Sequence, residues 1–239
     1  MEQEQNYNSK KLSVEEFKQR LLKEKTTTLR FRMTCSVDEA VVYLTASYMA
    51  EVELRNRTCE LDDDTLAHIY EAARWLVGDV SKPGLFICGK VGNGKTTLTR
   101  AIARLIAYKR DHEPVYDEHM VLRIIDARDV CQMMKDNYEN FKTLCNRPML
   151  AVDDFGVEPA EVVDYGNIIN PVTKLLSVRY DLQLFTILTS NLAPDEVGEV
   201  YDERLADRFN EMFHNIPFTN PSYRTPKKDG NKIDNAPSD

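Results

Sequence analysis

The chain has 239 residues, of which 42% are hydrophobic, and a formal net charge of −8 at pH 7. This length suits one α/β domain with a small appendage, and the apolar content is enough for a buried core. The acidic balance argues against indiscriminate nucleic-acid binding by the whole surface, and no apolar run approaches the roughly 20 residues of a membrane span.

The five cysteines are scattered along the chain and form no C-x-x-C pair. This spacing argues against a zinc site or a disulfide framework and favours a reducing compartment. We expect each cysteine to be a small buried hydrophobe. Residues 1–11 are polar and lack the apolar region of a signal peptide, so we predict a cytoplasmic protein.

Helix-start signals dominate the first third of the chain. Ser13-Val14-Glu15-Glu16 is a capping box that opens an amphipathic helix, and Ser36-Val37-Asp38-Glu39 opens a second helix running to about Arg55. A third helix begins at the acids Asp62-Asp63-Asp64, whose charge suits a helix N-terminus, and stops at Gly78.

The composition divides the chain into three predicted parts. These are a small N-terminal helical region (1–60), a core (61–224) and a disordered polar tail (225–239). Residues 1–34 carry a net charge of +3, from eight basic and five acidic side chains. This excess fits either a solvated helix face or a docking arm for an acidic partner or nucleic acid.

A phosphate-binding loop follows the first predicted strand. The apolar run from Gly84 ends at Gly89, and then come the rest of G-x-x-x-x-G-K-T and a helix-forming segment from Leu98 to Tyr108. Glycines let backbone N–H groups close around phosphate oxygens, Lys95 reaches the β- and γ-phosphates, and the Thr96 hydroxyl binds Mg²⁺. The predicted nucleotide-binding residues are Gly89, Val91, Gly92, Asn93, Gly94, Lys95, Thr96 and Thr97.

Strands and helices alternate through the rest of the core. The four further predicted strands are 121–125, 148–154, 184–191 and 214–219, and the helices between them cover 126–144, 168–180 and 202–212. This alternation predicts a parallel five-stranded sheet with helices on both faces. The fold class is therefore α/β, of the P-loop NTPase type.

Polar side chains stand at two further strand ends. Ligands of open α/β sheets bind at the carboxyl ends of the strands. Asp153 and Asp154 follow a buried strand, so one carboxylate can serve Mg²⁺ and the other can orient or deprotonate the attacking water. Asn191 follows the next strand and is placed to contact the γ-phosphate or that water.

Two arginines, Arg204 and Arg208, lie one helical turn apart on one predicted helix face. An arginine from a neighbouring subunit can stabilise the charge that develops during phosphoryl transfer. Salt bridges to Glu203, Asp207 or Glu211 explain the same pattern equally well. The residues alone do not decide between these two interpretations.

The ordered set of motifs resembles the DnaC/IstB-type AAA+ ATPases. The matching segments span roughly residues 60–224 and are the glycine loop, Val152-Asp153-Asp154-Phe155-Gly156, Leu188-Thr189-Ser190-Asn191, Glu203-Arg204-Leu205-Ala206-Asp207-Arg208 and Pro221-Ser222-Tyr223-Arg224. The resemblance implies an ATPase with Walker B acids at Asp153 and Asp154, sensor 1 at Asn191, an arginine finger at Arg208 and a second box arginine at Arg204.

The same resemblance implies cofactors and partners. ATP with Mg²⁺ would drive self-assembly, and the protein would engage single-stranded DNA and either a replicative helicase or a transposase, with residues 1–60 docking the partner. Two departures stand out. Asp154 is one methylene shorter than the glutamate of many AAA+ proteins, which implies slow hydrolysis, and the short stretch after the last strand leaves no room for a C-terminal helical lid with its sensor-2 arginine.

Other nucleotide-binding classes fit less well. Asn231-Lys232-Ile233-Asp234 matches the guanine-reading motif of GTPases, but it lies in the polar tail and not between a strand and a helix. A small-molecule kinase would need a lid arginine cluster, and Asp154-Phe155-Gly156 lacks the H-R-D loop of protein kinases. An interaction module that binds ATP with little hydrolysis stays open.

Overall fold

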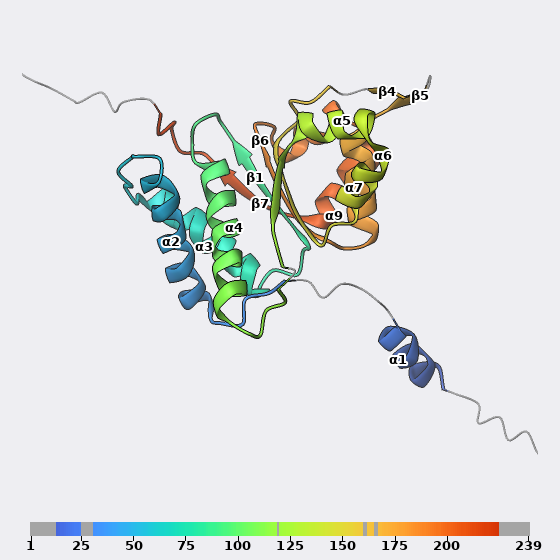
Figure 1. Ribbon diagram of the computed structural model, residues 1–239, viewed down its shortest axis with the longest axis horizontal. Coiled ribbons are helices and arrows are strands. Elements are labelled where there is room, and N and C mark those ends of the chain that lie inside the picture. Colours follow the sequence, from blue (N-terminus) through green and yellow to red (C-terminus); the bar gives the residue numbers. More distant parts are fainter. Residues whose placement is uncertain (1–12, 25–30, 119, 160–161, 165–166, 225–239) are drawn as a thin grey trace, which may run out of the picture.

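The protein is described by a computed structural model that covers residues 13–24, 31–118, 120–159, 162–164 and 167–224 (Figure 1). The predicted tail 225–239 lies outside the described residues. Within the described part of the chain, no helix has both the length and the apolarity needed to cross a membrane.

The core is a five-stranded, all-parallel sheet, as predicted. Its strands run in the order β2-β3-β6-β1-β7, so the strand that carries the glycine loop lies between β6 and an edge strand. The strand bounds are β1 (Gly84–Gly89), β2 (Arg123–Asp126), β3 (Met149–Phe155), β6 (Phe185–Ser190) and β7 (Phe213–Phe218). This order brings the carboxyl ends of β1, β3 and β6 together at one edge.

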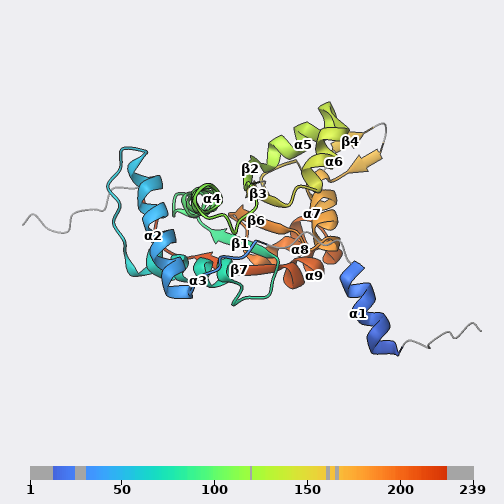
Figure 2. The ribbon, with the colours of Figure 1, turned by 60° about the horizontal axis from the view of Figure 1, so that its bottom comes forward.

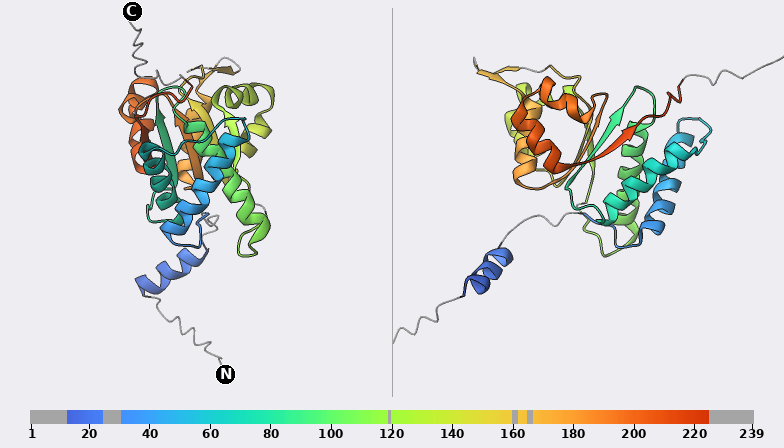
Figure 3. Two further views of the ribbon diagram at one scale, coloured as in Figure 1. Left: turned by 90° about the vertical axis from the view of Figure 1, so that its left-hand side faces the viewer. Right: turned by 180° about the vertical axis from the view of Figure 1, so that it is seen from behind.

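Helices cover both faces of the sheet (Figures 1, 2 and 3). One layer consists of α2 (Val37–Glu53), α3 (Asp63–Val77) and α4 (Lys95–His112). The other consists of α5 (Ala127–Asp136), α6 (Tyr138–Cys145), α7 (Pro171–Asp181) and α9 (Glu203–Met212). Alternate residues of each strand enter two separate cores, so that Leu85 and Ile87 pack under the first layer and Phe86 packs under the second.

Local signals set the predicted helix ends. The Ser36–Glu39 capping box forms at the start of α2, and the Asp62 side chain caps α3 by accepting from Thr65 N. Gly78 ends α3 in the left-handed conformation, at φ 92°. The first predicted helix is α1 (Val14–Glu24).

The structure corrects three expectations. The helix predicted over 126–144 is two helices, because Asn137 is extended (φ −155°), ends α5 and caps α6. The helix predicted from Ile168 begins only at Pro171, after a hairpin of β4 (Val162–Asp164) and β5 (Asn167–Ile169). Cys35 and Cys59 are only half-buried, whereas the other three cysteines are buried. Two short elements, η1 (Pro194–Glu196) and α8 (Val197–Val200), precede α9.

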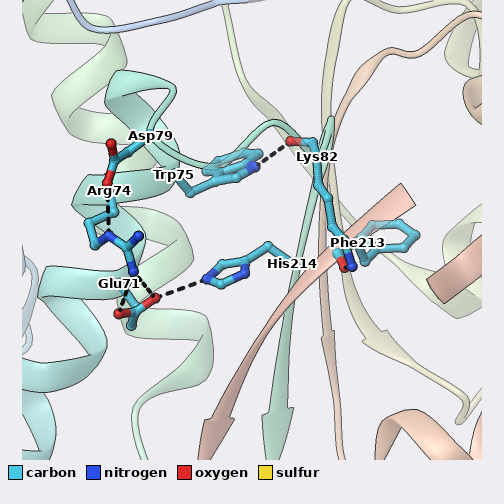
Figure 4. Close-up of polar contacts among 7 residues, drawn as sticks. All are labelled: Glu71, Arg74, Trp75, Asp79, Lys82, Phe213 and His214. Atoms are coloured by element: carbon cyan, nitrogen blue, oxygen red, sulfur yellow. Dashed lines mark hydrogen bonds and ion pairs between the residues drawn. The ribbon is translucent and has the colours of Figure 1, made fainter. Parts of the chain in front are cut away.

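A polar cluster ties α3 to the edge strand β7 (Figure 4). Glu71 contacts His214 Nε2 at 3.1 Å and also pairs with Arg74, whose Nε donates to Asp79 at 3.0 Å. Nearby, the Lys82 ammonium donates to Phe213 O at 2.9 Å. These contacts fix β7 beside β1, and β7 leads directly into the C-terminal segment that reaches the glycine loop.

Candidate functional site

The glycine loop connects the end of β1 to the start of α4. Gly89 has φ 142°, and a Cβ on it would lie 2.2 Å from Phe218 O. Gly92 has φ 85°, and its Cβ would lie 2.3 Å from Ser222 Oγ. Neither position accepts a side chain, because the loop packs closely against β7 at Gly89 and against the segment after β7 at Gly92.

Lys95 is buried at the first turn of α4. Its ammonium donates to Gly89 O at 2.6 Å, to Lys90 O at 2.8 Å and to Asn191 Oδ1 at 3.0 Å. Burial lowers the pKa of Lys95, and the carboxylates of Asp154 and Asp153 act in the opposite direction. The last contact joins the end of β6 to the glycine loop.

Thr96 and Asp153 lie side by side, because the Thr96 hydroxyl donates to Asp153 Oδ1 at 3.0 Å. A hydroxyl beside a carboxylate is the donor pair that P-loop proteins use to hold Mg²⁺. The neighbouring Asp154 has φ 57°. Burial raises the pKa of Asp154, and the negative charges of Asp153 and Asp126 add to this effect.

A cavity of 1380 Å³ unites these groups. All the predicted site residues line it except Gly89 and the two arginines of α9. The volume exceeds the roughly 300–1,000 Å³ of common small-molecule sites. The cavity therefore has room for a nucleotide together with groups from elsewhere.

Arg204 and Arg208 lie on α9, outside the cavity. Arg204 is exposed, and the Arg208 guanidinium lies 5.1 Å from the centre of the Tyr180 ring. Tyr180 in turn donates to Glu211 through its hydroxyl. Within the described parts of the chain neither arginine forms an ion pair, so the salt bridges considered above do not account for them.

Solved structures with this architecture include helicase loaders. The structure of DnaI aligns with a TM-score of 0.51 and 21% identity, covering 68% of this chain and 88% of DnaI. The structure of the DnaC helicase loader aligns with a TM-score of 0.53 and 20% identity, covering 67% of this chain and 93% of DnaC. This chain has the AAA+ fold of the DnaC-type proteins. The family resemblance drawn from the motifs is thus confirmed at the level of the fold, while neither the protein-family models nor the curated proteins gave a match.

Residues after β7 also belong to the cavity. The segment Pro221-Ser222-Tyr223-Arg224 forms part of the family resemblance, but the sequence predicted no site role for its residues. The Asn220 amide donates to Asn93 O at 3.0 Å, and Tyr223 N donates to Gly92 O at 2.9 Å. Arg224 lines the cavity, and its charge lowers the pKa of Lys95. The signal was the tyrosine and the arginine of Pro221-Ser222-Tyr223-Arg224, a few residues after the last strand.

A further wall of the cavity comes from α2 and from the connection between α2 and α3. Tyr48, Cys59 and Asp62 line the cavity there, together with Arg55, whose guanidinium donates to Thr97 Oγ1 at 3.3 Å. Tyr223 reaches this wall, with its hydroxyl 2.8 Å from Thr65 Oγ1 and 3.0 Å from Asp62 Oδ1. The C-terminal segment therefore bridges the glycine loop and the start of α3.

Proposed function

We propose that this chain is an AAA+ ATPase that binds ATP with Mg²⁺, hydrolyses it to ADP and phosphate, and assembles with copies of itself through the nucleotide. The observation that carries this proposal is the convergence of three strand ends on one cavity. The cavity is lined by Lys95 after β1, Asp153 on β3 and Asn191 after β6. Two hydrogen bonds join these strand ends, one from Lys95 to Asn191 and one from Thr96 to Asp153. A phosphate loop, a metal-binding pair and a sensor amide are the parts that phosphoryl transfer needs.

The residues present fit a nucleotide with its metal. The backbone N–H groups of the glycine loop would hold the phosphates, and Lys95 would contribute its positive charge. Thr96 and Asp153 would hold Mg²⁺, which when bound neutralises phosphate charge. Asp154 orients the attacking water and takes its proton as the water oxygen bonds to the γ-phosphorus and the bond to the β-phosphate bridging oxygen breaks.

The site is completed, in this proposal, by a second copy of the chain. Arg208 is positioned by the Tyr180 ring on a surface outside its own cavity, which supports a role as arginine finger in the neighbour's site. Arg204, one turn earlier and exposed, serves as the second arginine of that surface. Within its own chain, Arg224 supplies a further cation beside Lys95.

The partners follow from the relatives and from the N-terminal region. One structural neighbour, DnaC, is a helicase loader, which favours a replicative helicase as the protein partner. Single-stranded DNA is the nucleic acid that the resemblance to the DnaC/IstB-type ATPases implies. A transposition helper acting with a transposase is the alternative. In α1, Phe17, Leu21 and Leu22 are more than half exposed, which supports docking through residues 1–60 of a cytoplasmic protein.

The decisive experiment measures ATP binding and phosphate release by the full chain and by Lys95→Ala, with GTP as the competing nucleotide. We expect the parent to bind ATP in preference to GTP and to release phosphate, faster when DNA and partner are added, and we expect Lys95→Ala to do neither. ATP binding without any release of phosphate, with or without DNA, would favour the interaction module. Equal behaviour of the two chains would refute the proposed site.

A further inference from the structure

Two consecutive carboxylates, Asp153 and Asp154, line one cavity although they lie on a β-strand. Successive side chains of a regular strand point to opposite faces of the sheet. On β3, Ala151 packs into the core under α2–α4 and Val152 into the core on the other face. Strict alternation would therefore direct Asp154 into the second apolar core, where an unpaired carboxylate is strongly unfavourable.

A β-bulge resolves this conflict. Val152 pairs with Leu188 and Phe155 with Ser190, so Asp153 and Asp154 together face Thr189 alone on β6. Asp154 takes up the extra residue in the left-handed region, at φ 57°. As a result Phe155 enters the second core, and Asp154 faces the cavity beside Asp153.

The Thr189 side chain makes a hydrogen bond to each of the two residues of the bulge. Its hydroxyl oxygen accepts from Asp154 N at 3.0 Å, and the hydroxyl donates to Asp153 Oδ1. Thr189 is 1% exposed, so solvent cannot replace either bond. One side chain thus fixes the backbone of one acid and the carboxylate of the other.

We propose that Thr189 is the positioning residue of the ATP site, holding Asp153 toward Mg²⁺ and Asp154 toward the attacking water. This inference rests on the proposed ATPase function and adds to it a residue that does not itself line the cavity. Without the hydroxyl, Asp154 N would lose this hydrogen-bond acceptor, and the Asp153 carboxylate would keep its bond to Thr96 but lose its bond to Thr189. Groups that orient metal ligands in this way contribute roughly 10–100-fold to metal affinity or activity.

The test compares Thr189→Val, which keeps the shape and removes the hydroxyl, with Thr189→Ser, which keeps the hydroxyl. Thr186→Val is the matched control, because Thr186 is equally buried on the same strand and its hydroxyl bonds Arg179 and Leu184 O, away from the cavity. Three quantities are measured for every chain. The first is the affinity for a fluorescent ATP analogue in EDTA, that is, without Mg²⁺. The second is the Mg²⁺ concentration at which a non-hydrolysable ATP analogue gives half of its maximal increase in melting temperature, and the third is kcat for ATP hydrolysis.

We expect Thr189→Val to bind the analogue in EDTA within about twofold of the parent, and to need about tenfold more Mg²⁺ with a kcat lowered by about tenfold or more. Thr189→Ser should keep the Mg²⁺ requirement and kcat of the parent. Thr186→Val should have a lower melting temperature but the same Mg²⁺ requirement as the parent. If Thr189→Val does not fold, Thr189→Ala against Thr189→Ser decides in the same way.

A parent-like Mg²⁺ requirement and kcat in Thr189→Val would overturn the inference, and so would a serine variant as impaired as the valine or alanine variant. Absence of Mg²⁺-dependent ATP binding in the parent would instead overturn the proposed ATPase function itself. The two failures are therefore distinguishable.

Discussion

Removing a single oxygen atom breaks the hydrogen bonds between the Tyr223 side chain and the start of α3. In Tyr223→Phe the ring remains, but the hydroxyl that lies 3.0 Å from Asp62 Oδ1 and 2.8 Å from Thr65 Oγ1 is lost. The backbone bond from Tyr223 N to Gly92 O remains. The substitution therefore loosens the C-terminal segment on one side only, and Arg224 beside the phosphate loop loses part of its positioning.

The magnitude follows from the hydrogen bond to a charged acceptor. Such bonds contribute about 1.5–3 kcal/mol when buried. The Tyr223–Asp62 contact is exposed, and Asp62 also caps α3 through Thr65 N, so we take a value near 1 kcal/mol. Since 1.4 kcal/mol corresponds to a factor of ten, the dissociation constant for ATP should rise about threefold to tenfold through weaker placement of Arg224.

A double-mutant cycle tests this reasoning. ATP dissociation constants are measured for the parent, Tyr223→Phe, Arg224→Ala and the double variant at fixed salt. If Tyr223 acts through Arg224, the hydroxyl has no further effect once Arg224 is gone, and the double variant matches Arg224→Ala. Additive losses, or a Tyr223→Phe chain that binds ATP as tightly as the parent, would refute the role assigned to the segment.

Three further outcomes are expected. Asp154→Asn should bind ATP without cleaving it and should melt slightly above the parent by calorimetry, because it removes a half-buried charge that Asp153 repels. Arg208→Ala should bind ATP normally but fail in ATP-driven assembly by light scattering, and parent-like assembly would exclude the finger role. Burial lowers the pKa of His68, so His68 binds a proton more readily in the unfolded chain, and stability is lost as the pH falls below about 6.5. His68→Gln should remove that part of the fall in melting temperature between pH 7.5 and 5.5. A fall of unchanged size would show that other groups cause it.

The sequence predicted those features that depend on local signals. The loop from Gly89 to Thr96 needs only glycines and a following helix, and the acids after β3 stand out because a buried strand precedes them. Asn137 also carried a signal, since asparagine is a good N-cap, but the apolar spacing of α5 and α6 hid the break between them.

Features that depend on distant contacts could not be predicted in the same way. Tyr223 forms hydrogen bonds to Asp62 and Thr65, which are more than 150 residues away in the sequence. No motif in the residues next to Tyr223 predicts these partners. The hairpin before α7 has strands of only three residues, too short to show an alternating pattern. The bulge at Asp153 and Asp154 is set by the pairing of β3 with β6, which a single strand sequence does not contain.

The bulge also gives a physical reason for aspartate at position 154. Many AAA+ proteins carry glutamate there, and the shorter side chain by itself implied slow hydrolysis. At φ 57°, however, the backbone lies in the left-handed region, which costs most residues about 1–2 kcal/mol and which aspartate and asparagine adopt more readily than glutamate does. The bulge also keeps Asp154 out of the apolar core and on the cavity wall. The identity of the acid and the shape of the strand therefore depend on each other, and the Thr189 hydroxyl makes a hydrogen bond to both residues of the bulge.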